Sequence, residues 1–227
     1  LFNRSGYTDF ENAKADIIVI NTCSVTAQSD KKAGQTLRRC RKENPQAVII
    51  LTGCMVQAFP ERSESLKEAD IVIGNTDISK ILSETEKFLK TKLRIFSVDH
   101  HKATDVYNTP LISNFSERTR AYMKIEDGCD RFCTYCIIPY AKGRVRSRNL
   151  EEIKKEAEML ALNGFSEIVL VGINLSSYGK GENFDLADAV ETVCDTEGIK
   201  RVRLGSLEPD CISDEMLKRL KSPEKFC

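Results

Sequence analysis

Short runs of β-branched residues alternate with helical patterns in the amino-terminal part of the sequence. The expected strands and helices are, in chain order, 16–23, 29–44, 47–52, 60–68, 70–73 and 77–90. Strands that are joined through helices pair in parallel, because the helix serves as the crossover connection. Residues 1–97 are therefore predicted to form a small doubly wound α/β domain around a parallel sheet.

The same alternation returns after a polar stretch, 98–118, which contains Pro110 and has no sustained period. This stretch is predicted to be a domain linker. Beyond it, the expected strands and helices are 121–126, 149–163, 167–172, 185–195, 201–206 and 213–220. Three strand–helix units suit a (β/α) barrel, and the sequence ends before such a barrel could close. Residues 119–227 are therefore predicted to be an incomplete (β/α) barrel.

The overall charge excludes a globally basic nucleic-acid-binding protein. The 227 residues include 34 basic and 34 acidic side chains, which leaves room only for a local basic patch. No apolar run approaches the ~20 residues that cross a bilayer, so no membrane span is expected. The sequence begins at Leu1 and stops at Cys227 in a segment that looks unfinished, so we expect a longer protein that continues beyond both ends.

Nine cysteines are spread through these long periodic patterns. The count is odd, and small disulfide-bonded scaffolds are instead short and rich in loops. This usage indicates reduced thiols in the cytoplasm, with metal ligands among them.

Three of the cysteines, Cys129, Cys133 and Cys136, lie in the string DGCDRFCTYCIIPYAKG, directly after an expected strand. A structural zinc site needs four ligands, and no fourth cysteine or histidine is close in sequence. An iron–sulfur cluster with three thiolate ligands keeps one iron open for a substrate or cofactor. The alternatives are a zinc loop that borrows His100 or His101, or three ordinary core cysteines.

Cys23 and Cys54 each lie just beyond the carboxyl end of an expected parallel strand. Ligands bind at that edge of a doubly wound sheet, so the two thiols are predicted to face one shared site. Cys40 falls late in the intervening helix and is expected at the opposite edge. Two buried structural cysteines are the alternative for Cys23 and Cys54. The cysteines without metal spacing, which we expect to be packing residues, are Cys194, Cys211 and Cys227.

The stretch around the cysteine loop is locally basic. Residues 118–148 hold eight basic and three acidic side chains, a net charge of +5. Lys142, Arg144, Arg146 and Arg148 follow the loop, and at its rim they would suit the phosphates of an RNA. The alternative is a solvated loop that leads into the next helix.

These motifs resemble a known family. A CxxxCxxC loop after the first strand of a βα barrel resembles the radical S-adenosylmethionine (SAM) superfamily. The stretch AYMKIEDGCDRFCTYCIIPYAKGRVRSR is similar to its methylthiotransferase branch. INTCSVT and LTGCMVQ resemble the amino-terminal domain of that branch, and LVGINLSSYG and RVRLGSLEP resemble two later barrel motifs.

The resemblance implies a tRNA methylthiotransferase. Such an enzyme adds a methylthio group to C2 of a modified adenosine next to the anticodon, and the loop is most similar to enzymes that act on N6-threonylcarbamoyladenosine. Enzymes for isopentenyladenosine or for a ribosomal protein are the nearby alternatives. A non-catalytic zinc-binding RNA module is the alternative from a different class. The implied partners are tRNA and a flavodoxin-like or ferredoxin-like electron donor, in the cytoplasm.

The resemblance also implies two 4Fe–4S clusters and SAM as cofactors. Cys129, Cys133 and Cys136 would hold the catalytic cluster that binds SAM. Cys23 and Cys54 would hold the second cluster, together with a cysteine upstream of Leu1, and this cluster would deliver the methylated sulfur.

The expected SAM-binding residues follow the strands of the barrel. Tyr135 in the loop is expected to lie against the adenine, and Gly172 and Asn174 to receive the methionine end. The Gly-Gly-Glu string common in the superfamily is absent at that position. Ser206 and Glu208 follow the third strand, where Glu208 would bind the ribose or the ammonium group; a simple strand-end turn is the alternative.

Overall fold

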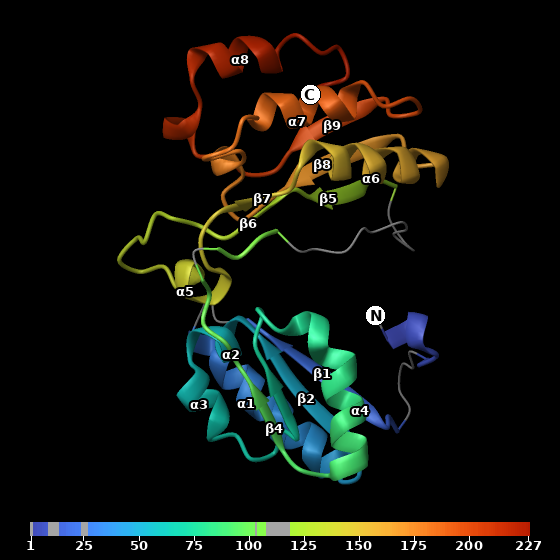
Figure 1. Ribbon diagram of the computed structural model, residues 1–227, viewed down its shortest axis with the longest axis vertical. Helices are drawn as coiled ribbons and strands as arrows, with labels where there is room; N and C mark the ends of the chain where they lie inside the picture. The colour runs from blue at the N-terminus through green and yellow to red at the C-terminus, as the bar shows by residue number, and fades with distance from the viewer. Residues whose placement is uncertain (1, 9–13, 24–26, 103, 108–118) are drawn as a thin grey trace. The chain divides into compact units, whose positions relative to one another are not determined.

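The computed structural model describes residues 2–8, 14–23, 27–102, 104–107 and 119–227 (Figure 1). The chain divides into two compact units. The first is Leu1–Lys102 with Arg131–Lys142, and the second is Ala103–Asp130 with Gly143–Cys227. Most of the linker expected at 98–118 lies outside the described residues. Among the described residues, no helix has the length and apolar character needed to cross a membrane.

The first unit is built on a four-stranded parallel sheet with the strand order β1-β2-β3-β4. Its strands are β1 (Ile17–Thr22), β2 (Val48–Gly53), β3 (Ile71–Ile73) and β4 (Ile95–Ser97). The first three agree with the strands expected from the sequence to within one residue at each end. β4 was not expected, because its sequence, IFS, is not a run of β-branched residues like the IVI of β3.

Helices cover both faces of this sheet. They are α1 (Ala27–Glu43), α2 (Cys54–Ala58), α3 (Pro60–Glu64) and α4 (Ile81–Thr91), with short 3-10 turns η1 (Phe2–Ser5) and η2 (Ile78–Lys80). The side chains of β2 alternate between two cores. Ile49 packs in one buried cluster with Leu37 of α1, and Ile50 packs in the other with Phe88 of α4. This confirms a doubly wound α/β arrangement.

The second unit holds a parallel sheet with the order β5-β8-β9 and a small antiparallel pair. The strands are β5 (Ala121–Lys124), β8 (Glu167–Val171), β9 (Arg201–Leu204), β6 (Glu126–Asp127) and β7 (Arg146–Ser147). The helices are α6 (Leu150–Leu162), α7 (Leu186–Cys194) and α8 (Asp214–Leu220), with 3-10 turns η3 (Leu175–Ser177) and η4 (Pro209–Cys211). The strand–helix repeat confirms the expected partial barrel.

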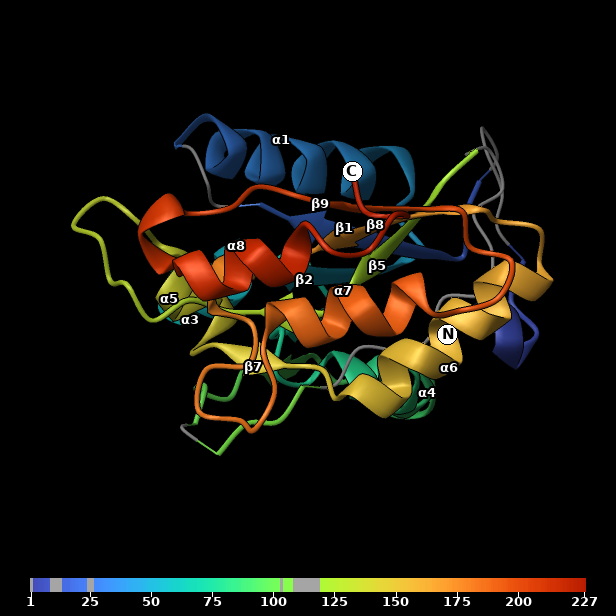
Figure 2. The same ribbon diagram turned by 90° about the horizontal axis from the view of Figure 1, so that it is seen from above.

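Helices α6, α7 and α8 pack against each other in chain order (Figure 2). Each of them begins at a side-chain cap that the sequence supplies. Asn149 accepts a hydrogen bond from the Glu152 N–H at 2.8 Å, and Ser213 accepts one from the Met216 N–H at 3.1 Å. Asp185 forms a reciprocal capping box at the start of α7. Apolar side chains of these helices bury one face of the sheet in a single core.

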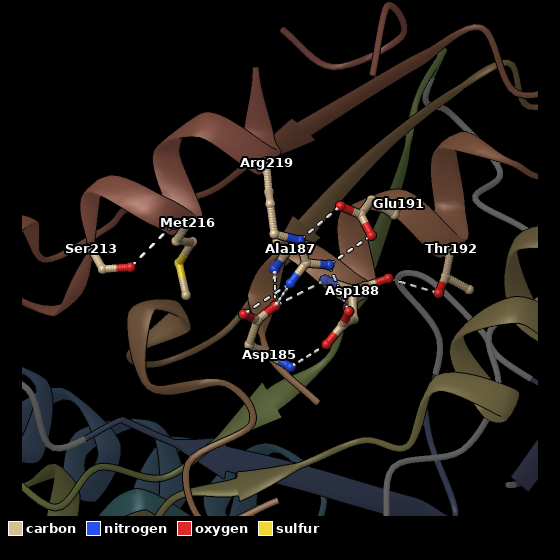
Figure 3. Close-up of polar contacts among 8 residues, drawn as sticks. All are labelled: Asp185, Ala187, Asp188, Glu191, Thr192, Ser213, Met216 and Arg219. Atoms are coloured by element: carbon tan, nitrogen blue, oxygen red, sulfur yellow. Dashed lines mark hydrogen bonds and ion pairs between the residues drawn. The ribbon is translucent and has the colours of Figure 1, made fainter. Parts of the chain in front are cut away.

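Arg219 attaches α8 to α7 (Figure 3). Its guanidinium donates hydrogen bonds to Asp188 and Glu191, each at 2.7 Å, and lies 3.2 Å from both carboxylate oxygens of Asp185. These three carboxylates hold the pKa of Arg219 well above its ordinary value, Glu191 most strongly. One cation is thus shared by three acidic side chains of a single helix start.

Candidate functional site

Cys23 and Cys54 follow residues that are paired across the first sheet. Thr22 of β1 is in register with Gly53 of β2, so both thiols come directly after the same level of the sheet's carboxyl edge. The Thr22 hydroxyl donates to the Thr52 carbonyl at 2.6 Å and accepts from the Met55 N–H at 3.2 Å. These bonds fix the turn that carries Cys54. Cys23 is exposed and Cys54 is half-buried.

Gly53 allows the chain to pass from β2 into α2 close to the end of β1. Its φ is 103°, in the left-handed region, and a side chain there would collide with the Thr22 backbone. The start of α2 can therefore lie against the end of β1 only because position 53 is glycine.

Cys40 lies at the other end of the first unit. It sits near the carboxyl end of α1, and its neighbour Arg41 donates a hydrogen bond to the Ala47 carbonyl at 2.9 Å, just before β2 begins. That position is the amino edge of the sheet, opposite the edge of Cys23. Cys40 is half-buried and packs against the core of this face.

The boundary between the two units runs through the cysteine loop. Cys129 belongs to the second unit, where its N–H donates to the Gly143 carbonyl at 3.1 Å. Cys133 and Cys136 belong to the first unit, and the Cys136 N–H donates to the Cys133 carbonyl at 2.9 Å. All three thiols are free and half-buried. Within the described parts of the chain, no three Cys, His, Asp or Glu side chains lie close enough to hold a metal ion.

The loop is anchored to the first unit by α5 (Ile138–Lys142), which packs on α2. The Asn75 side chain donates to the Ala141 carbonyl at 2.8 Å, and a ring nitrogen of His101 lies 3.3 Å from the same oxygen. The unit that carries Cys23 and Cys54 therefore also carries two cysteines of the loop. Asn75 was missed in the sequence, although its place just beyond the end of β3 is a signal for a site residue.

A fully buried carboxylate, Glu126, joins the ends of two strands in the second unit. It lies two positions after Lys124, the last residue of β5, and its side chain is fully buried. Its Oε2 accepts a hydrogen bond from the N–H of Asn174, which lies beyond β8, at 2.7 Å. A methyl group on Gly172 would lie 2.5 Å from the same oxygen. Burial raises the pKa of Glu126 to about 7, and the Asn174 bond only partly offsets that rise. Its second oxygen, Oε1, has no hydrogen-bond partner among the described residues.

Asn174 in turn reaches the cysteine loop. Its side-chain amide lies 3.9 Å from the sulfur of Cys129 and donates to the Ser177 hydroxyl at 2.9 Å. Two of the residues expected at the SAM site, Gly172 and Asn174, are thus brought to Cys129 and to a buried carboxylate that the sequence reasoning missed. The signal for Glu126 was available, because an acidic residue at the end of a predicted strand is unusual in a core.

The other expected cofactor residues are more exposed. Tyr135 is 90% exposed. Ser206 and Glu208 are both exposed beyond β9, and the Glu208 N–H donates to the Ser176 hydroxyl at 2.6 Å. That bond ties the end of the third strand to the turn after the second. The predicted roles of these three residues stay predictions.

The basic residues after the loop separate into two kinds. Arg144 is exposed, Lys142 is half-buried, and Arg146 is half-buried with its guanidinium 3.6 Å from Asp127. Arg144 is therefore the most open of the three to a ligand from solution, whereas the side chain of Arg146 is only 13% exposed.

Arg148 is different, and its expected place at a rim is wrong. Its side chain is 1% exposed and donates to Glu156 of α6 at 2.8 Å. Its carbonyl also accepts from the Tyr178 hydroxyl at 2.6 Å. The charge of Arg148 is neutralised inside the unit, where breaking a buried pair is costly, so this residue is structural.

Two parts of the chain match models of known protein families. Residues 1–74 match the model of Uncharacterized protein family UPF0004, and residues 123–224 match that of the Radical SAM superfamily. A solved radical SAM methyltransferase, TsrM from Kitasatospora setae, is similar in fold with a TM-score of 0.50 and 14% identity, over 91% of this chain and 50% of that one. The first part of the chain is thus similar to UPF0004 proteins and the second part to radical SAM proteins.

Relatives at higher identity are methylthiotransferases. The chain is 40% identical to "Threonylcarbamoyladenosine tRNA methylthiotransferase MtaB" of Bacillus subtilis and 37% identical to that of Aquifex aeolicus, over 100% and 99% of its length. It is 34% identical to "tRNA-2-methylthio-N(6)-dimethylallyladenosine synthase" of Clostridium perfringens over 100% of its length. It spans about half the length of these relatives, 51% to 55%. These matches confirm the resemblance to the radical SAM methylthiotransferase family.

Proposed function

We propose that this protein is a radical SAM methylthiotransferase that modifies N6-threonylcarbamoyladenosine in tRNA. The observation that carries the proposal is the presence of both domains in one chain that matches MtaB methylthiotransferases along its whole length. The identities of 40% and 37% to proteins of that name, against 34% to a dimethylallyladenosine synthase, favour threonylcarbamoyladenosine as the substrate base.

The donor set of the loop fits an iron–sulfur cluster. Cys129, Cys133 and Cys136 are free thiols, and soft thiolates are the ligands that such clusters take. Since the structure does not gather three ligands, binding would draw the loop together, as metal binding does at sites that are not preformed. When bound, a 4Fe–4S cluster with three thiolate ligands supplies an open iron for SAM and an electron for its cleavage.

The residues of the chain would support this chemistry by position. The Asn174 amide donates toward the Cys129 sulfur, and hydrogen bonds to cluster sulfurs tune their potential. Gly172 leaves room for the backbone of the turn, and Glu126 fixes that turn through the Asn174 N–H. Ser206, Glu208 and Tyr135 would complete the contacts to SAM.

Cys23 and Cys54 are proposed to hold a second 4Fe–4S cluster. The register of β1 and β2 supports a shared site, because it sets both thiols after paired residues at one sheet edge. Two thiolates are too few for such a cluster, so it would need at least one further ligand. Cys40 lies at the opposite edge of the sheet and is not a candidate.

Partners follow from the same proposal. Lys142, Arg144 and Arg146 would contact the phosphates of tRNA without reading its bases. A flavodoxin-like or ferredoxin-like protein would supply the electrons. Action on tRNA would place the protein in the cytoplasm.

Reconstitution tests this function directly. The full-length protein would be loaded anaerobically with iron and sulfide, then given SAM, a reductant and tRNA that carries N6-threonylcarbamoyladenosine. Mass spectrometry of the nucleosides should show the 2-methylthio derivative. The same assay with tRNA that carries isopentenyladenosine is the control. A methylthio product formed only with the control tRNA would show that the enzyme acts on isopentenyladenosine. A colourless protein that binds zinc would show that it is a non-catalytic module.

A further inference from the structure

Helix α1 presents an exposed face on which five cations are accompanied by two uncharged polar residues, Gln28 and Gln35. We call the five cations the basic face, and they are Lys31, Lys32, Arg38, Arg39 and Lys42. Each of these side chains is exposed, whereas Leu37 on the opposite side of the helix is fully buried. The only exposed acidic side chain described on α1 is Glu43.

The spacing of these residues aligns them along the helix axis. Lys31, Arg38 and Lys42 are seven and four residues apart, which at 3.6 residues per turn sets them within about 20° of one line along the helix. Lys32 and Arg39 repeat the seven-residue spacing on the adjacent line. From Lys31 to Lys42 the row is about 16 Å long, at 1.5 Å per residue.

None of the five cations forms an ion pair or a side-chain hydrogen bond with another described residue. Arg41 on the same helix shows the contrast. It donates to Asp70 at 2.6 Å and to the Glu68 carbonyl at 2.9 Å, so its charge is used within the fold. Helix α4, on the other face of the sheet, mixes its charges instead, with Lys87 3.4 Å from Glu84.

Local helix energetics do not explain the basic face. Arg38 and Lys42 are a like-charged pair at i,i+4, which costs a helix a few tenths of a kcal/mol. A cation in the last turn gains from the helix dipole, and this accounts for Lys42. Lys31 and Lys32 lie near the amino end, where the dipole disfavours positive charge. The helix dipole therefore accounts for the carboxyl end of the row only, and does not explain the cations at its amino end.

We infer that the basic face is a docking surface for the phosphate backbone of tRNA. A straight row of unpaired cations on a rigid helix complements a polyanion, and backbone contacts need no base-specific side chains. This inference rests on the proposed function and adds to it a second RNA contact, on the UPF0004 domain, separate from residues 142–146.

Binding as a function of salt concentration tests the inference in the full-length, cluster-loaded protein. The basic-face variant is K31Q/R38Q/K42Q. The control variant, K67Q/K87Q/K90Q, removes the same number of charges from other surfaces of the same unit. Glutamine keeps helix propensity close to that of lysine and arginine. The probe is tRNA that carries N6-threonylcarbamoyladenosine, in fluorescence anisotropy titrations at ~50 to ~200 mM KCl.

We expect the basic-face variant to bind tRNA about tenfold or more weakly at low salt. Its slope of log affinity against log salt should be shallower by about two to three units, because three phosphate contacts are lost. The control variant should keep the wild-type slope. The charge-conserving variant K31R/R38K/K42R should also keep it, which separates charge from any change in folding.

Equal slopes for the basic-face variant and the wild type would overturn the inference and leave the proposed function intact. A second outcome would also overturn it. If the basic-face variant binds tRNA with wild-type affinity, but turns over more slowly with a protein electron donor and normally with dithionite, the basic face binds an acidic protein instead. Failure of the wild type to bind tRNA at all would instead overturn the proposed function, and this inference with it.

Discussion

Glu126 accepts a hydrogen bond from the backbone N–H of Asn174 at 2.7 Å, and the two residues are separated by 48 positions in the sequence. The bond fastens the end of β5 to the turn beyond β8, next to Cys129. A buried carboxylate in this place links stability to pH, and it makes the turn sensitive to small changes in volume.

The free energy of unfolding should depend on pH through Glu126. Its pKa is about 7 when folded against 4.5 as the ordinary value, so the folded unit binds the proton more tightly than the unfolded chain. The stabilisation is complete below about pH 4.5 and is lost as the pH rises through about 7, a change of up to ~3 kcal/mol. Urea unfolding of wild type and Glu126→Gln between pH 5 and 8 measures it. The Gln variant should lack this part of the slope, and identical pH dependences would refute the assignment.

Gly172→Ala should disrupt the same turn. The added methyl group would lie 2.5 Å from Glu126 Oε2 and 2.9 Å from its Cβ, so the turn must shift. We expect a loss of about 1–3 kcal/mol in stability and a weaker affinity for SAM by equilibrium dialysis. Gly205→Ala is the matched control beyond β9, because its nearest described atoms would be 3.5 and 3.6 Å away. If the two substitutions changed stability and SAM affinity equally, contact of the added methyl group with Glu126 would not be the cause.

Removing Arg219 should loosen α8. Arg219→Met would leave Asp185, Asp188 and Glu191 close together without their shared cation (Figure 3). Because the cluster is partly exposed, we expect a loss of only about 1 kcal/mol, smaller at high salt. Faster amide exchange confined to α8 and the start of α7 would report it. Arg201→Met, which removes a cation from exposed contact with Glu167, is the control and should leave α8 unchanged.

The cysteine loop should account for the cleavage of SAM. In the full-length reconstituted protein, Cys133→Ala leaves two thiolates, too few to hold the cluster, so iron content should fall and 5′-deoxyadenosine formation should stop. Cys40→Ser removes a thiol at the opposite edge of the first sheet and should change neither. Undiminished 5′-deoxyadenosine from Cys133→Ala would remove the loop from the proposed site.

The sequence predicted the elements well where hydrophobic periodicity was strong. β1, β2 and β3 lie within one residue of their expected ends, and the two larger sheets are parallel as expected. β4 was missed because IFS is not a β-branched run like that of β3, and α2 was missed because it begins directly after β2 with no turn between them. Periodicity depends on local sequence, so it reports short-range order best.

Contacts between distant residues could not be predicted from a single sequence. Arg148 was expected at a surface because its charge stands in a basic run, but Glu156 from the next helix pairs with it in the core. The packing of α5 on the first unit depends on Asn75 and Ala141, 66 positions apart. Such pairings depend on which residues the fold brings together, and that cannot be derived from the local sequence.

The most direct test of the proposed function is mass spectrometry of tRNA nucleosides from cells that lack the gene and from cells in which it is restored. Deletion should remove the 2-methylthio group from N6-threonylcarbamoyladenosine, leave the methylthio derivative of isopentenyladenosine unchanged, and be reversed by the wild-type gene but not by Cys133→Ala. An unchanged level of methylthiolated threonylcarbamoyladenosine in the deletion strain would contradict it.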